Sequence, residues 1–92
     1  MIRSFEDKET ERLFLDGKSR RYGSISIAAR RKLQVLDNTR ELEDLRQPAG
    51  NHLEALKGSR KGQHSIRIND QYRICFVWLK AEPHNVEIVD YH

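Results

Sequence analysis

Glycines and basic side chains cluster in one stretch of the second half of the sequence, residues 56–73 (LKGSRKGQHSIRINDQYR). Gly58 and Gly62 permit a tight turn there, because glycine adopts backbone conformations that other residues avoid. Three cations belong to this turn: Lys57, Arg60 and Lys61. A turn that brings backbone N–H groups and cationic side chains to one side suits an oxyanion such as phosphate. The stretch is therefore predicted to be the working surface of the protein.

Two strands are predicted after the turn, and each contributes a further cation, Arg67 in the first and Arg73 in the second. Residues 63–69 alternate apolar and polar side chains, which is the pattern of a strand with one buried face. A polar turn comes next, and a second strand that begins at Tyr72 would place Arg73 near Arg67 in a hairpin. Five cations then share this region with a single acid, Asp70. Each alone is more simply a solvated charge, but together they favour an anion site.

The size and charge of the chain narrow the function classes. At 92 residues, with a formal charge of +3, the sequence has the size of one domain, residues 1–92, with a single modest core. Residues 18–32 contain six cations and no acid: Lys18, Arg20, Arg21, Arg30, Arg31 and Lys32. A basic stripe of this kind indicates a polyanion partner, most often nucleic acid. A soluble surface of mixed charge is the competing interpretation, because the net excess is small.

The apolar segments, the cysteine and the histidines argue against a membrane protein, a thiol-dependent enzyme and a metalloprotein. No apolar stretch is long enough to cross a bilayer and no signal sequence is visible, so we expect a soluble, cytoplasmic chain without membrane contact. Cys75 is the single cysteine and lies in an apolar run, which predicts a buried thiol rather than a nucleophile. The four histidines show no paired ligand spacing, so we expect neither a metal nor another cofactor.

Helical patterns dominate the first half of the chain and strand patterns the second. Asp7 is placed to cap a short helix that Gly17 ends, and residues 26–37 form an amphipathic helix. Residues 72–79 (YRICFVWL) are apolar on both faces, as in a central strand, and residues 85–91 form the last strand. This order predicts an α+β fold, in which a small, mostly antiparallel sheet has N-terminal helices packed on one face.

Three shorter segments carry weaker patterns. Residues 1–5 alternate briefly and are expected to form an opening strand. Thr39 is placed to cap a short helix that follows the amphipathic one. Tyr22 lies in the basic loop between the helices, where a surface position is expected and stacking on RNA is the functional alternative.

Four segments of the sequence together resemble one protein family. They are MIRSF at the start, LEALKGSRKG, HSIRINDQYRICF and, at the C-terminus, VEIVDYH. In this order they are similar to the HigB-type toxins of bacterial type II toxin–antitoxin modules, members of the RelE-like superfamily, over nearly the whole chain. The resemblance implies a RelE-like fold and an endoribonuclease that cuts translated mRNA on the 30S subunit of the ribosome. It also implies a cognate HigA-like antitoxin with a helix-turn-helix domain.

The resemblance implies roles for individual residues as well. Metal-free RNA cleavage needs a base for the 2′-OH proton, an acid for the leaving 5′-oxygen and cations for the negative phosphorane. Basic positions of the family are matched by Lys57, Arg60 and Arg73, which would clamp the phosphate. Further RNA contacts, including contacts with ribosomal RNA phosphates, would come from the remaining basic residues: Lys61, Arg67, Arg20, Arg21, Arg30, Arg31 and Lys32.

The last three residues match the family's terminal Asp-Tyr-His. His92 would transfer a proton, because histidine has an ordinary pKa of about 6.5. Asp90 would orient His92 or balance its charge, and Tyr91 would stack on an RNA base. A frayed chain end without function is the competing interpretation.

The general base has two candidates in the segment before Leu-Lys-Gly, and the third possibility is that the role is shared elsewhere. Some family members have a histidine in the segment before Leu-Lys-Gly, where this chain has Glu54 and, two residues earlier, His52. On a strand the two would share a face, so alternation excludes neither. A non-catalytic RNA- or DNA-binding module that uses the same cations is the alternative function, and a protein-interaction domain with a basic surface is a third.

Overall fold

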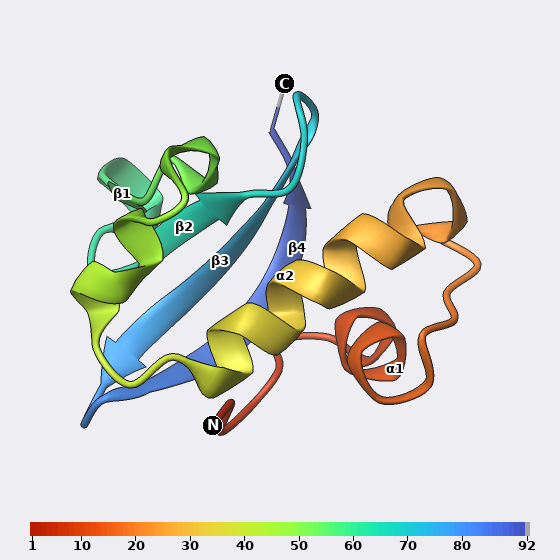
Figure 1. Cartoon of the computed structure of the whole chain (residues 1–92), viewed down its shortest axis with the longest axis horizontal. Helices are drawn as coiled ribbons and strands as arrows, with labels where there is room; N and C mark the ends of the chain where they lie inside the picture. Colours follow the sequence, from red (N-terminus) through yellow and green to blue (C-terminus); the bar gives the residue numbers. More distant parts are fainter. Residues whose placement is uncertain (92) are drawn as a thin grey trace.

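The computed structural model describes residues 1–91 of the chain, so His92 lies outside the described residues. Two α-helices precede four strands in this range: α1 (Lys8–Asp16), α2 (Ser26–Asn38), β1 (Glu54–Ala55), β2 (His64–Arg67), β3 (Tyr72–Leu79) and β4 (Glu82–Asp90). Short 3-10 turns connect them (Figure 1). Neither helix is long and apolar enough to cross a membrane.

The bounds of α1 follow from its capping residues. Asp7 caps the N-terminus, where its Oδ2 accepts a hydrogen bond of 3.1 Å from the Thr10 N–H. Gly17 ends the helix in the left-handed conformation (φ 74°), and its N–H donates to the Leu13 carbonyl. Both capping predictions are confirmed.

The amphipathic helix α2 runs one residue beyond its predicted end. Its apolar stripe consists of Ala29, Leu33 and Leu36, which are all fully buried. Because these residues recur at helical spacing, the sequence alone was sufficient to predict this element.

Two of the weaker predictions are wrong. The expected strand at residues 1–5 is reduced to one parallel bridge between Phe5 and Val86. Thr39 does not cap a following helix, because its hydroxyl donates a hydrogen bond of 2.7 Å to a carbonyl in the last turn of α2. The segment that follows is a 3-10 helix, η2 (Leu42–Arg46).

The four strands form one antiparallel sheet in the order β1-β2-β3-β4. β3 has the predicted bounds, and its register pairs Arg73 with Arg67, which confirms the predicted hairpin. β4 begins at Glu82 rather than at residue 85. The difference arises because Asn85, at φ 53°, accommodates a bulge inside the strand.

The hydrophobic core lies between the sheet and the helices. Ile66, Ile74 and Phe76 are fully buried on one face of the sheet, where they form a cluster with Leu13 of α1 and Leu33 of α2. Figure 1 shows both helices on that side of the strands. This arrangement confirms the predicted α+β class with helices on one face.

Tyr22 belongs to the core and not to the surface. It is 6% exposed, and its hydroxyl donates a hydrogen bond of 3.3 Å to the Ile88 carbonyl of β4. Its ring meets that of Tyr72 edge-on, with 5.7 Å between centroids. The expected surface position is therefore wrong, since the basic loop folds back against β4. Burial raises the pKa of Tyr22, and the nearby Arg21 opposes the effect.

The alkaline stability of the protein should depend on Tyr22. The pKa of its hydroxyl in the folded state lies above the ordinary value of 10.0, so its stabilising contribution is complete below that pH. The contribution is lost as the pH rises through the folded pKa. Tyr22→Phe should lower the free energy of unfolding by about 0.5–1.5 kcal/mol at neutral pH, through loss of the hydrogen bond. It should also flatten the alkaline decline in urea unfolding, and an unchanged decline would contradict this assignment.

Candidate functional site

Neither α-helix of residues 1–91 packs against one face of the sheet, which carries polar side chains from alternate strand positions. The register pairs Glu54 of β1 with Ser65 of β2, and Ser65 with Cys75 of β3. Arg73 lies two positions before Cys75 and therefore points to the same face, as does its β4 partner, Val89. We call the surface that these five residues define the helix-free face.

Arg73 is the buried cation of the helix-free face, with 8% of its surface exposed. Its Nε donates a hydrogen bond of 2.8 Å to the Ser65 hydroxyl. Its Nη2 donates to the backbone carbonyls of His52 and, at 3.3 Å, Ser65. Its Nη1 lies 3.9 Å from a carboxylate oxygen of Glu54, which is half exposed. The guanidinium is thus fixed on two nitrogens, and the third faces an acid at the rim.

The chain end contributes Tyr91 to this group but not Asp90. The centroid of the Tyr91 ring lies 5.8 Å from the guanidinium carbon of Arg73, within the range of a cation–π contact. Asp90 pairs with Tyr72, whose side chain packs against the core, so Asp90 points to the helix side of the sheet. There its Oδ2 accepts a hydrogen bond of 3.1 Å from Gln71.

The glycine-bracketed turn forms as predicted, and the side chain of Arg60 in this turn reaches β4. Gly58 (φ 66°) and Gly62 (φ 95°) both adopt the left-handed region. Between them, Arg60 donates from Nη1 to Gln63 at 3.0 Å and to the carboxylate of Glu87 on β4 at 2.8 Å. The hydrogen bond to Glu87 raises the pKa of Arg60 still further, so it stays charged.

The expected excess of five cations over one acid is wrong for the folded protein. Three of the cations have carboxylate partners: Arg60 with Glu87, Arg67 with Asp70, and Arg73 with Glu54. Two of these acids come from outside residues 56–73, and strand pairing brings them in. Lys57 and Lys61 are exposed in the turn.

Cys75 is a buried thiol, as predicted. It is fully buried on the helix-free face, and burial raises its pKa, while Arg60 and Arg73 oppose the effect. A thiol that holds its proton is a poor nucleophile. The structure therefore gives Cys75 a packing role.

Two of the cations predicted to bind RNA from the helical half are instead tied to the protein. Arg30 donates hydrogen bonds of 3.1 Å to the carbonyls of Phe14 and Leu15, at the C-terminus of α1. A Cβ at Gly17 would lie 2.9 Å from its Nη1, so the glycine also makes room for this contact. Lys32 donates to the side-chain oxygen of Asn51.

The other cations of this region remain at the surface. Arg20 and Arg31 are exposed, and the exposed Arg21 lies over the ring of Tyr22 at 5.6 Å. A hollow of about 250 Å³ beside β4 is lined by residues of both halves of the chain: Arg21, Tyr22, Arg60, Tyr72, Glu87, Ile88, Val89 and Asp90. The basic loop and the glycine-bracketed turn therefore meet at this hollow.

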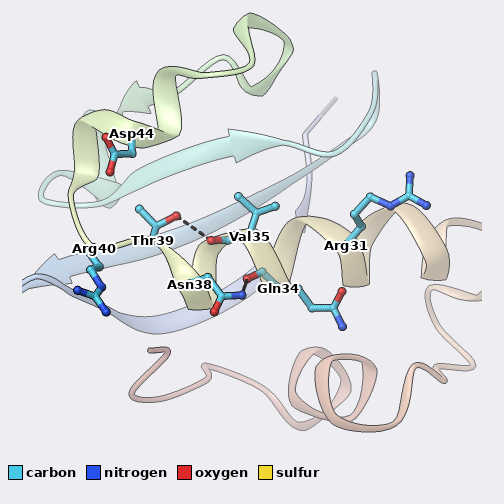
Figure 2. Close-up of a pocket in the computed structure, with 7 residues that line it drawn as sticks. All are labelled: Arg31, Gln34, Val35, Asn38, Thr39, Arg40 and Asp44. Atoms are coloured by element: carbon cyan, nitrogen blue, oxygen red, sulfur yellow. Dashed lines mark hydrogen bonds between the residues drawn. The ribbon is translucent and has the colours of Figure 1, made fainter.

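A larger hollow, of about 580 Å³, lies along α2 rather than beside Arg73 (Figure 2). Its walls come from α2 and the segment after it: Arg31, Gln34, Val35, Asn38, Thr39, Arg40 and Asp44. These side chains include one carboxylate, Asp44, and no histidine or second acid, so the hollow lacks the pair of groups that acid–base catalysis requires. Among residues 1–91, no three His, Cys, Asp or Glu side chains gather as a metal site would require.

Comparison with known proteins identifies the family. Residues 3–92 match the HigB-like toxin family, described as the RelE-like toxin of type II toxin-antitoxin system HigB. The chain belongs to this family. A type II toxin has an antitoxin as its partner, so one is implied for this HigB-like toxin.

Individual relatives agree with the family match. The chain is 44% identical over 81 residues to Toxin HigB-1 of Vibrio cholerae serotype O1, covering 86% of this chain and 85% of the relative. It is 29% identical over 93 residues to Endoribonuclease HigB of Proteus vulgaris, covering the whole of both chains. An uncharacterized protein of Haemophilus influenzae is 38% identical over 56 residues, or 61% of this chain and 55% of the relative.

Sequence reasoning missed three groups that contact the site arginines of this HigB-like toxin. They are the Ser65 hydroxyl, the His52 carbonyl and the Glu87 carboxylate. Strand alternation alone would have placed Ser65 and Glu87 on the face of Arg73 once the register was known. The sequence carries no signal for the carbonyl, because it depends on the path of the backbone before β1.

Adjacent arginines of α2 should differ sharply in their effect on stability. Arg30→Ala should lower the free energy of unfolding by about 1–2 kcal/mol, because it removes two charge-assisted hydrogen bonds, one of them solvent-exposed. Arg31→Ala should change it by about 0.5 kcal/mol or less, as expected for an exposed position. Chemical denaturation of the two variants measures the contrast, and equal losses would show that the Arg30 contacts are not stabilising.

Proposed function

We propose that this HigB-like toxin is an endoribonuclease that cleaves translated mRNA on the ribosome and so inhibits translation and growth. The main support is the cluster of Arg73, Glu54 and Tyr91 on the helix-free face. It combines a fixed cation, an exposed carboxylate and an aromatic ring within reach of one bound nucleotide. The name of the Proteus vulgaris relative, Endoribonuclease HigB, points the same way.

The proposed reaction uses the RNA's own 2′-OH as nucleophile. A base removes its proton, the 2′-oxygen attacks the adjacent phosphorus, and the bond to the 5′-oxygen breaks as an acid protonates that oxygen. The products are a 2′,3′-cyclic phosphate and a 5′-hydroxyl. Negative charge grows on the phosphorane, and Arg73, Lys57 and Arg60 are the cations proposed to stabilise it.

Glu54 is the better of the two candidate bases. Its carboxylate lies 3.9 Å from Nη1 of Arg73, so a phosphate bound to that nitrogen would sit beside it. His52 does not share a strand face with Glu54, because it precedes β1 in the left-handed conformation (φ 44°), and its carbonyl serves Arg73. We propose His92 as the acid, with Tyr91 stacking on a base.

The ribosome supplies the second part of the proposal. Arg20, Arg21 and Arg31 remain exposed and are proposed to contact phosphates of ribosomal RNA on the 30S subunit, a contact that weakens with salt. Because Asp90 points away from Arg73, it does not pair with Glu54 as an acid with its base. Ribosome binding is proposed to complete the site. The antitoxin that neutralises this toxin is proposed to be a HigA-like helix-turn-helix protein.

Mapping of mRNA 5′ ends in a purified translating system tests the proposal. The wild type should produce new ends within codons, only when ribosomes are present. Arg73→Ala should lower the cleavage rate by about 10²–10³-fold, as expected for loss of a transition-state cation. Removal of His92 should also abolish most cleavage, whereas Arg3→Ala, at an exposed position outside the site, serves as the control. Binding to ribosomes without any cleavage by the wild type would instead favour a non-catalytic RNA-binding module.

The same assay separates the two candidate bases. Glu54→Gln should reduce the rate by about 10²–10⁴-fold, the contribution expected of a general base. His52→Asn should retain activity within a few fold, because asparagine tolerates the left-handed conformation and keeps the carbonyl that holds Arg73. The opposite pattern would assign the base to His52.

A further inference from the structure

The guanidinium of Arg73 is held by neutral oxygen atoms on two of its nitrogens. The Ser65 hydroxyl accepts from Nε at 2.8 Å, and the carbonyls of His52 and Ser65 accept from Nη2. Neutral acceptors orient the planar fork without cancelling its charge. The positive charge is thereby directed, through Nη1, toward Glu54 and the rim of the site.

The His52 carbonyl reaches Arg73 only because the backbone is turned at that point. His52 has φ 44° and ψ 58°, a conformation that residues other than glycine adopt rarely and only when the surroundings hold it. It follows the short 3-10 turn η3 (Ala49–Asn51), and its N–H donates to the Ala49 carbonyl at 3.1 Å. The position of this carbonyl therefore depends on what fixes η3.

Asn51 fixes η3 from inside the protein. It is fully buried, and its Nδ2 donates hydrogen bonds of 3.1 Å to the carbonyls of both Leu45 and Gln47. Its N–H donates to the Pro48 carbonyl at 2.9 Å. These three hydrogen bonds tie Asn51 to the segment before it and so hold η3 in place.

Lys32 completes the connection from the helical layer. Its ammonium donates to the side-chain oxygen of Asn51, and the residue is only partly exposed on α2. In Figure 1 the green segment that contains η3 lies beside β2, and η3 contacts β2. A continuous path therefore leads from the Lys32 hydrogen bond with Asn51, along the backbone to His52, to the hydrogen bond that Arg73 donates to the His52 carbonyl.

We infer that Ser65, Asn51 and Lys32 are positioning residues for Arg73, and that Lys32 serves the site through this path of hydrogen bonds and backbone rather than by binding RNA. The inference rests on the proposed function, in which Arg73 stabilises the phosphorane. It assigns a role to a cation that the charge pattern alone groups with the RNA-binding residues. A displacement of about 1 Å is enough to weaken the stabilisation that a catalytic guanidinium gives to a transition state.

Kinetics on mRNA-programmed ribosomes distinguish positioning from RNA binding. Ser65→Ala and Lys32→Met should each slow the rate at saturating ribosomes by about 10-fold or more, with the half-saturating concentration changed by about 2-fold or less. Methionine keeps the apolar stem of Lys32 and removes only the ammonium. Arg31→Met, one residue away and exposed, should show the reverse: a raised half-saturating concentration and a reduced salt dependence.

A double-variant comparison gives a readout that a general loss of structure would not reproduce. In an Arg73→Lys background the Nε donor is gone, so Ser65→Ala should add no further loss of rate. Ser65→Thr, which keeps the hydroxyl, should recover most of the rate that Ser65→Ala loses. Thermal unfolding of each variant confirms that the fold persists.

The outcomes separate this inference from the proposed function. If Arg73→Ala abolishes cleavage while Ser65→Ala and Lys32→Met leave the saturated rate unchanged, the positioning roles are wrong and the function stands. If Lys32→Met raises the half-saturating concentration as Arg31→Met does, Lys32 binds RNA instead. If Arg73→Ala itself retains the wild-type rate, the proposed site is wrong.

Discussion

The burial of one positive charge constrains the whole sheet half of the structure. Arg73 sits on the third of four strands and is 8% exposed, and a buried guanidinium is tolerated only when its N–H groups find acceptors. Strand β2 must therefore present the Ser65 hydroxyl in register, and the chain before β1 must turn to offer the His52 carbonyl. β1 begins only at Glu54, two residues after His52, whose left-handed backbone interrupts the extended geometry.

The division into two layers gives each face of the sheet a separate task. Leucine and alanine from α1 and α2 bury one face, and this face carries most of the hydrophobic core. The helix-free face can then carry polar side chains at alternate strand positions. The helices also use some of their charge internally: Arg30 joins α2 to α1, and Lys32 joins α2 to η3. The basic stripe of residues 18–32 is thus partly structural.

Features set by neighbouring residues could be predicted from the sequence, and features set by distant ones could not. Asp7 and Gly17 determine the bounds of α1 locally, and the β-branched and aromatic run of β3 is unambiguous. The α+β class and the Arg67–Arg73 pairing followed from such patterns. The acids that accompany the cations were missed because Glu54 and Glu87 arrive through strand register. Tyr22 was misplaced because its burial depends on how a loop packs against β4.

Any phosphate that uses these arginines must exchange with a carboxylate. Arg60 donates to Glu87 at 2.8 Å, and Arg73 faces Glu54 at 3.9 Å. A phosphate that approaches either arginine is therefore repelled by the carboxylate beside it. The two pairs differ in a way that matters. The Arg60 contact is a formed hydrogen bond, whereas the Arg73 contact is longer than one, and its fixed guanidinium has already lost its rotational freedom. A phosphate therefore gains most at Nη1 of Arg73, where neutral atoms orient the guanidinium and the nearby carboxylate lies farther away than a hydrogen bond.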